Sequence, residues 1–219
     1  MSDAPFPAHG ETHYRRIRTK ICGITRLEDA LHASRLGVDA LGFVFYRKSP
    51  RYIDPDRAAA IIFDLPPFIT TVGLFVNPTH DDLEQVLHHC PLDMLQFHGD
   101  ETPGLCTMQR LPVIKAISVS GKEDLERVAS YDCPVLLDAK APAGVYGGHG
   151  QCFDWSLLEG FDHRHELILA GGLNAANVRQ ALTLRPWYAV DVSSGVESAP
   201  GVKDAAAMET FVARINAPF

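Results

Sequence analysis

Two side chains capable of acid or base chemistry lie where apolar segments of the sequence stop. Cys22 ends the run that begins at Arg18, just before a glycine, and Asp138 follows the run 134–137. A thiol can serve as a base when a cation is close, and Lys20, on the same strand face, is a candidate for that cation. A carboxyl can serve as an acid if it keeps its proton at neutral pH, which burial and a nearby carboxylate favour. Such a pair is typical of proton transfer within one small molecule.

Each of these residues also has a structural interpretation. Cys22 could be a small buried core residue, since cysteine is often buried. Asp138 could instead cap the loop that follows it. The position of Cys22 at a strand end before glycine favours a functional thiol, because active-site residues of parallel α/β folds gather at strand ends.

A basic loop follows the second apolar run. Residues 46–53 contain Arg47, Lys48 and Arg51. A guanidinium binds a planar carboxylate through two parallel hydrogen bonds, so we expect Arg51 to hold a carboxylate of the ligand. The alternative is an ordinary charged and exposed loop.

Three further polar residues, His98, Asp100 and Asp191, follow other apolar runs. His98 and Asp100 could hold a metal beside the two carboxylates, but a cysteine, not a second histidine, occupies the first strand end. We therefore expect His98 to be a hydrogen-bonding residue in the wall of a substrate site. Asp191 either contacts a hydroxyl or amine of the substrate or fixes its own loop.

Two loops near the C-terminus have the composition of a phosphate site. Gly171 and Gly172 follow one apolar run, and Ser193, Ser194 and Gly195 follow the next. Neither loop contains lysine or arginine, so the phosphate would be bound by backbone N–H groups, which glycine allows to approach closely. The pairing of the two loops favours this interpretation over two simple turns.

The elements that would position these residues alternate regularly. Short runs rich in Val, Ile, Leu and Phe are separated by stretches long enough for one crossover helix each, which predicts parallel strands. Eight such units favour an α/β fold, a single-domain (β/α)8 TIM barrel with its functional residues at the C-terminal strand ends. The predicted strands are 18–22, 40–45, 70–76, 94–97, 113–117, 134–137, 167–170 and 188–190.

Helix boundaries follow from local signals. Thr25 and Glu28 have the spacing of a capping box that opens a helix through Leu36, which Gly37 ends. Asp54 and Pro55 predict the start of the next helix. Further helices are expected at 81–89, near 122–129, from 153 and from 174. The stretch 139–152, which carries four glycines, is the longest predicted loop, and a loop of this length is usually functional.

Composition limits the class of protein. The 219 residues are 46% hydrophobic and 21% charged, which fits one catalytic domain, residues 17–219, after a flexible extension, residues 1–16. The net charge of −7 argues against nucleic-acid and anionic-membrane partners, so we expect a small-molecule partner. We also expect a monomer or weak homodimer. Five cysteines without CxxC spacing, and an N-terminus without an apolar segment, predict reduced thiols and a cytoplasmic location.

Eight motifs, in order along the chain, resemble those of the phosphoribosylanthranilate isomerase family. They are KICGIT (20–25), GFVFYxxSPRYI (42–53), VGxFVN (72–77), QxHGxE (96–101), LD (137–138), GGxGxxFDW (147–155), GGLN (171–174) and DVSSGVE (191–197). These single-substrate sugar isomerases of tryptophan biosynthesis convert N-(5-phosphoribosyl)anthranilate into 1-(2-carboxyphenylamino)-1-deoxyribulose 5-phosphate without cofactor or metal. The reaction is an Amadori rearrangement.

The resemblance implies roles for individual residues. Cys22 would be the general base, Asp138 the general acid, and Arg51 the ligand of the anthranilate carboxylate. Gln151 and Cys152 depart from the Lys-Thr pair that is common in the family. Two alternatives stay open: a metal-dependent ketopentose-phosphate epimerase on the same barrel, and a phosphate-binding barrel without catalysis.

Overall fold

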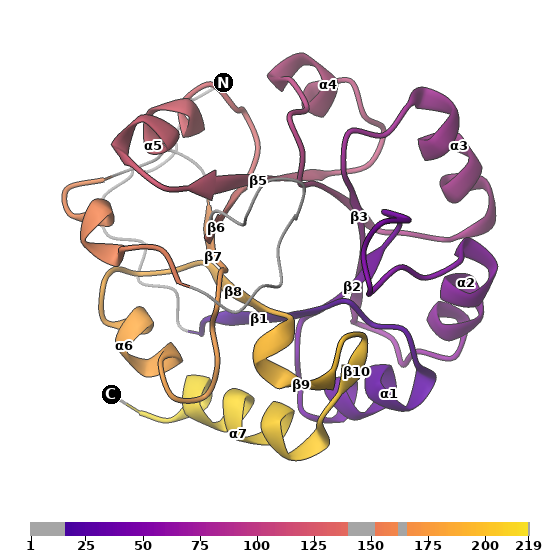
Figure 1. The fold of residues 1–219 in the computed structure, drawn as a ribbon. Helices are drawn as coiled ribbons and strands as arrows, with labels where there is room; N and C mark the ends of the chain where they lie inside the picture. Colours follow the sequence, from indigo (N-terminus) through magenta and orange to yellow (C-terminus); the bar gives the residue numbers. More distant parts are fainter. Residues whose placement is uncertain (1–15, 140–151, 162–165, 219) are drawn as a thin grey trace, which may run out of the picture.

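The computed structural model describes residues 16–139, 152–161 and 166–218, within which parallel strands close into an eight-stranded barrel in sequence order. The last strand pairs back with the first, Arg18 opposite Ala189. The predicted (β/α)8 barrel is therefore confirmed (Figure 1). The strands are β1 (Arg18–Cys22), β2 (Ala40–Val44), β3 (Thr70–Phe75), β4 (Met94–Phe97), β5 (Val113–Val119), β6 (Val135–Ala139), β7 (Leu167–Leu169) and β8 (Ala189–Val192).

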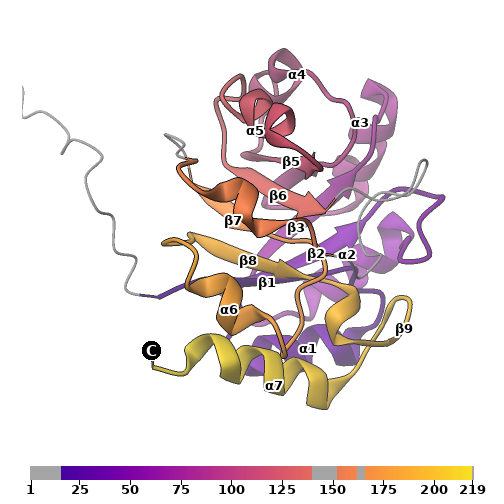
Figure 2. The same ribbon diagram turned by 60° about the vertical axis from the view of Figure 1, so that its left-hand side comes forward.

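Helices form a ring outside the barrel (Figure 1). They are α1 (Leu27–Arg35), α2 (Pro55–Phe63), α3 (His80–His89), α4 (Pro103–Thr107), α5 (Lys122–Val128), α6 (Val178–Leu182) and α7 (Ala205–Asn216), with short 3-10 helices η1 (Trp155–Leu158) and η2 (Ser194–Val196). A small hairpin of β9 (Glu197–Ala199) and β10 (Val202–Lys203) follows η2. Seen from the side, β9 lies at the end of the barrel toward which the strands point (Figure 2).

Strand alternation separates two layers of the core. Ile21 and Leu41 pack outward against the helices, whereas Val72, Ile114 and Leu136 fill the barrel interior. Successive side chains of a strand point to opposite faces, so Lys20 and Cys22, on either side of Ile21, point inward. The period of two in β1 thus directs the thiol toward the axis of the barrel.

Local sequence signals predicted one helix start correctly and another wrongly. The side chain of Asp54 accepts from the backbone N–H of Asp56, with Pro55 in the first turn, as predicted. The capping box at Thr25 is wrong, because the N-cap of α1 is Arg26 and makes no side-chain cap bond. The Thr25 hydroxyl instead donates to the carbonyl of Gly201, so a contact with the β9–β10 turn has displaced the local cap.

Several boundaries and elements differ from the prediction. Asp138 and Asp191 are the second-to-last residues of β6 and β8 and do not lie beyond these strands, because the pairing with neighbouring strands continues through both. The helix expected from residue 153 is the 3-10 helix η1, and α6 begins at Val178 because Asn174 forms a turn by accepting from the N–H of Ala176. The alternation of the barrel predicts helices after β4 and β8, but no local signal gave the positions of α4 and α7, and the β9–β10 hairpin was not predicted. Residues 1–15 of the predicted extension 1–16, and residues 140–151 of the glycine-rich loop 139–152, lie outside the described residues.

All five cysteines carry free thiols. In the part of the chain that the structure describes, no helix has both the length and the apolar character needed to cross a membrane.

Candidate active site

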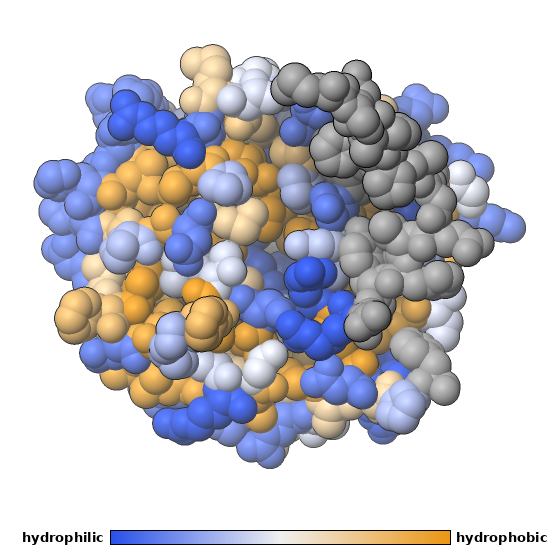
Figure 3. Space-filling view, turned by 180° about the vertical axis from the view of Figure 1, so that it is seen from behind, coloured by the Kyte–Doolittle hydropathy of each residue, from blue (hydrophilic) through white to orange (hydrophobic). Residues whose placement is uncertain are grey.

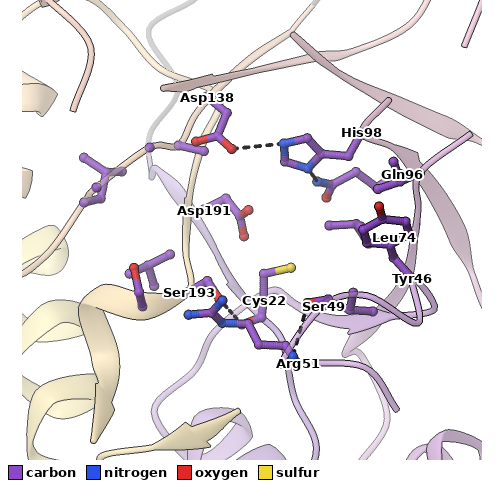
Figure 4. A pocket seen from close by; sticks show the side chains of 18 residues that line it. Cys22, Tyr46, Ser49, Arg51, Leu74, Gln96, His98, Asp138, Asp191 and Ser193 are labelled. Carbon is purple, nitrogen blue, oxygen red and sulfur yellow. Dashed lines mark hydrogen bonds and ion pairs between the residues drawn. The ribbon is translucent and has the colours of Figure 1, made fainter. Parts of the chain in front are cut away.

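A cavity opens at the C-terminal ends of the strands, where the sequence predicted the functional residues. It brings together Cys22, Arg51, His98, Asp138 and Asp191 with the loops after β7 and β8 (Figure 4). Most of the predicted site residues line it, including Gly171, Gly172, Ser193 and Ser194; Gly195 does not. The other lining residues are Val44, Tyr46, Ser49, Leu74, Val76, Gln96, Ala170, Leu173 and Val192.

Cys22 is buried at the end of β1 and its sulfur points into the cavity (Figure 4). Gly42 on the neighbouring strand makes room for it, since a Cβ at that position would lie 2.7 Å from Sγ. Burial raises the pKa of the Cys22 thiol, while Lys20 and Lys203 act in the opposite direction. The thiol therefore depends on nearby cations to reach its basic form.

Lys20 supplies one of these cations from inside the barrel. Its ammonium lies 2.9 Å from Asp191 Oδ1, and both side chains are buried. Burial alone would lower the pKa of Lys20, but Asp191 and Cys22 outweigh burial and raise it, so the ammonium stays charged. Asp191 thus has a structural partner across β1 and β8 as well as a place in the cavity wall.

Asp138 has a hydrogen-bond partner on each carboxylate oxygen. Oδ1 accepts from the backbone N–H of Ala139 at 2.8 Å, and Oδ2 lies 3.0 Å from Nε2 of His98. Gly171 has φ +80, and a Cβ there would lie 2.4 Å from the Ala139 nitrogen. Only glycine fits at this point, and it lets the loop after β7 pass directly beside Asp138.

His98 lies beside the predicted acid, where sequence reasoning had placed it only in the wall of the site. Its second ring nitrogen, Nδ1, lies 3.2 Å from Nε2 of Gln96, which is fully buried. Gln96, His98 and Asp138 therefore form one line of hydrogen bonds from β4 to β6 (Figure 4).

Arg51 is held by a carboxylate that the sequence did not single out. Nε lies 2.9 Å from Glu197 Oε1, and Nη2 lies 2.6 Å from Oε2. Lys203 contacts the same carboxylate at 2.7 Å and also donates to the backbone carbonyl of Cys22 at 2.5 Å. Burial would raise the pKa of Glu197, but Arg51 and Lys203 more than compensate and hold it below its usual value. Arg51 is 9% exposed, so it is not part of an ordinary surface loop.

Glu197, Lys203 and Gln96 are the site residues that sequence reasoning missed. Glu197 ends the DVSSGVE motif and Gln96 begins the QxHGxE motif, so both had a signal in the sequence. Lys203 had none, because it reaches Cys22 only through the hairpin, across 181 residues of chain.

The two loops of the predicted phosphate site lie side by side. Gly171 and Gly172 both have positive φ, which turns the chain sharply after β7. Ser193 donates through its hydroxyl to the carbonyl of Cys22 at 3.0 Å. A Cβ at Gly195 would lie 1.9 Å from the carbonyl oxygen of Leu173, so this glycine keeps the two loops in contact from outside the cavity.

The candidate metal pair is not assembled. Asp100 is exposed and absent from the cavity lining, whereas His98 is directed at Asp138. In residues 16–139, 152–161 and 166–218, no three His, Cys, Asp or Glu side chains are grouped in a way that could hold a metal ion.

The fold and the cavity define a (β/α)8-barrel protein with a thiol and a carboxyl at its C-terminal mouth. A model of the N-(5'phosphoribosyl)anthranilate (PRA) isomerase family matches residues 19–214. The N-(5'-phosphoribosyl)anthranilate isomerase of Pseudomonas putida is 54% identical over 203 residues, covering 91% of this chain and 98% of the relative. That of Thermotoga petrophila is 48% identical over 200 residues, covering 90% and 97%.

Solved structures agree. The phosphoribosyl anthranilate isomerase of Thermotoga maritima superposes with a TM-score of 0.85 at 47% identity, covering 91% of this chain and 98% of that one. A second isomerase structure, in complex with reduced 1-(o-carboxyphenylamino)-1-deoxyribulose 5-phosphate, has a TM-score of 0.82 at 44% identity, with the same coverage. This chain belongs to the N-(5'-phosphoribosyl)anthranilate isomerase family.

Proposed function

We propose that this protein converts N-(5'-phosphoribosyl)anthranilate into 1-(2-carboxyphenylamino)-1-deoxyribulose 5-phosphate in tryptophan biosynthesis, with Cys22 as general base and Asp138 as general acid. The main observation behind the proposal is that the buried thiol of Cys22 and the buried carboxyl of Asp138 line the same cavity in a chain of this family. Support also comes from the relative whose structure contains a reduced form of that product.

The reaction needs one proton given and one proton taken at different atoms of the sugar. Asp138 gives its proton to the furanose ring oxygen, the bond from C1 to that oxygen breaks, and an iminium forms between C1 and nitrogen. The Cys22 thiolate then takes the proton from C2, and the electron pair of that bond neutralises the iminium to give an enolamine. Loss of the C2 hydroxyl proton and gain of a proton at C1 complete the aminoketose. A net proton transfer from Cys22 to Asp138 through solvent restores the enzyme.

Arg51 would bind the anthranilate carboxylate. The loops after β7 and β8 would bind the phosphate. Glu197 orients the Arg51 guanidinium, and Lys203 contacts both Glu197 and the backbone carbonyl of Cys22. The same contacts therefore position the carboxylate site and the base. For the phosphate we retain Gly171, Gly172, Ser193 and Ser194, whose backbone N–H groups would be the donors, and Gly195, which would keep the two loops in contact. We retain His98 and Asp191 as further residues of the substrate site.

Replacing Arg51 by alanine is expected to raise KM about 10- to 100-fold and to change kcat much less. Hydrogen bonds to a charged group contribute about 1.5–3 kcal/mol, and this contact would be made in substrate and transition state alike. Arg51→Lys should recover part of the loss, because the charge remains without the guanidinium fork. Arg47→Ala, in the same loop but outside the cavity lining, is the matched control and should behave like the parent protein. Unchanged kinetics in Arg51→Ala would remove the assignment.

The metal-dependent epimerase alternative makes a different prediction. We expect full isomerase activity in excess chelator, because proton transfer is assigned to side chains of the chain itself. Activity would be measured after dialysis against EDTA, with and without added zinc or iron. Inactivation that either metal reverses would contradict this account.

Residues 17–219 are proposed to be the catalytic domain, with residues 1–16 as a flexible extension. Strand β1 begins at Arg18 and the family match begins at residue 19. Deleting residues 1–14 is therefore expected to leave kcat, KM and melting temperature nearly unchanged. A large loss of activity or of melting temperature in the shortened chain would show that the segment packs on the barrel.

We further propose a cytoplasmic monomer or weak homodimer. One Thermotoga maritima structure is described as mutually generated monomers of the dimeric isomerase. In this chain Phe68 is 97% exposed. It lines a hollow of about 430 Å³ together with residues from the amino ends of the strands. Figure 3 shows the face of the molecule behind the view of Figure 1, where these strand ends lie. A second copy could cover this apolar side chain, and light scattering over a range of concentrations would distinguish the two states.

Complementation tests the activity in cells. Expression in a bacterial strain that lacks its own phosphoribosylanthranilate isomerase should restore growth without tryptophan. A folded and well-expressed protein that fails to restore growth would contradict the proposed function.

A further inference from the structure

Gln96 lies behind the residues that would perform the reaction. It lies in β4, two residues before His98, so both side chains project to the same side of the strand and into the barrel. Gln96 is 0% exposed, His98 7% and Asp138 4%. The three side chains are therefore shielded from water, and their hydrogen bonds to one another fix their orientation.

The contacts define where His98 carries its proton. A neutral imidazole has one donor nitrogen and one acceptor nitrogen. The amide Nε2 of Gln96 is a donor and lies 3.2 Å from Nδ1, so Nδ1 accepts. The proton of the neutral ring is then on Nε2, which donates to Oδ2 of Asp138 at 3.0 Å.

The oxygen of the Gln96 amide has no competing partner within residues 16–139, 152–161 and 166–218. This atom, Oε1, is buried and makes no hydrogen bond among the described residues. The one hydrogen bond of the Gln96 side chain among the described residues is to the imidazole that touches Asp138.

We propose that Gln96 is a positioning residue for the acid step. Its amide selects the His98 tautomer that donates through Nε2 to Asp138. This inference rests on the proposed function, in which Asp138 is the acid. When the Asp138 proton passes to the ring oxygen and the C1–oxygen bond breaks, the carboxylate left behind is stabilised by His98 Nε2–H and Ala139 N–H. With the opposite tautomer, Nε2 would present a lone pair to that carboxylate and oppose the transfer.

Nuclear magnetic resonance of 15N-labelled protein reads the tautomer directly. Long-range 1H–15N spectra distinguish a protonated ring nitrogen from an unprotonated one, and a His98→Asn variant assigns the signals among the ten histidines. We expect Nε2 protonated and Nδ1 unprotonated in the parent protein. In Gln96→Glu, whose carboxylate can only accept, Nδ1 should become protonated. A parent protein with its proton on Nδ1, or a Gln96→Glu variant with an unchanged tautomer, would overturn the proposal.

Steady-state kinetics then test whether the His98 tautomer contributes to catalysis. Gln96→Leu keeps a similar volume and removes the amide, so it should fold with an unchanged or higher melting temperature. We expect its kcat to fall roughly tenfold or more with KM changed less than about threefold. In a His98→Asn background the same change should have little further effect. Gln109→Leu, which removes an amide bonded to the Leu105 carbonyl outside the cavity, is the matched control.

The possible failures are distinguishable. An equal effect of Gln96→Leu in both backgrounds, or an effect on KM alone, would mean that the amide acts through packing or on the substrate, and would overturn the positioning role. A silent Gln96→Leu beside an inactive Asp138→Asn would overturn this inference and leave the proposed function intact. An active Asp138→Asn would instead remove the acid on which both rest.

Discussion

Asp138→Asn should be a folded protein with kcat reduced by at least about 100-fold. General acid catalysis contributes roughly 10²–10⁴-fold, and asparagine has no proton to release. Asparagine has nearly the same shape, and its oxygen can still accept from Ala139 N–H. We therefore expect KM to change far less than kcat, because the lost contribution belongs to the transition state.

The melting temperature of Asp138→Asn distinguishes a catalytic role of Asp138 from a structural one. If Asp138 served mainly to cap its loop, the asparagine variant would melt at a lower temperature and lose activity by unfolding. Asp93→Asn is a useful comparison, because Asp93 accepts from the Thr71 backbone at 2.7 Å and the Thr71 hydroxyl at 2.8 Å, outside the cavity lining. It should lower the melting temperature and leave kcat unchanged. A kcat of Asp138→Asn within about tenfold of the parent would assign the acid elsewhere, with Asp191 the next candidate.

Cys22→Ser should lose activity by a comparable factor, about 100-fold or more in kcat. The serine hydroxyl is similar in size to the thiol but far less acidic, so it does not supply the anionic base at neutral pH. Because burial raises the pKa of the Cys22 thiol, the kcat/KM of the parent protein should increase with pH as the thiolate forms. The serine variant should lack this increase.

Cys133→Ser is the matched control for the thiol. Cys133 precedes β6 at the amino end of the barrel and is absent from the cavity lining, so its replacement should leave kcat and the pH profile unchanged. A Cys22→Ser variant with the parent pH profile would exclude Cys22 as the base and direct attention to Asp191.

Much of this arrangement was predictable because the signals are local. An apolar run that stops at a polar residue or glycine marks a strand end, and the closed barrel brings all strand ends to one rim. That reasoning found Cys22, His98, Asp138 and Asp191. The basic loop after the second apolar run added Arg51, and all five residues line one cavity. The helix start at Asp54 and Pro55 was also encoded in two adjacent residues.

Partners across the barrel were not predictable. Arg51 contacts Glu197 across 146 residues of sequence, and Lys203 contacts Cys22 across 181. No local pattern reports such pairs. The same hairpin accounts for the wrong capping box, because the Thr25 hydroxyl is engaged by Gly201. The direction of the hydrogen bonds was equally unpredictable, since the role of the Gln96 amide follows only from its contact with His98.

The most direct test follows the fluorescence of phosphoribosylanthranilate after addition of purified protein. Parent protein should abolish the anthranilate-type signal rapidly in the presence of chelator, while equal amounts of Cys22→Ser or Asp138→Asn should leave it decaying about 100-fold more slowly or not at all. Undiminished fluorescence with the parent protein, or equal rates for the parent and both variants, would contradict the assignment of this cavity and its two proton-transfer residues.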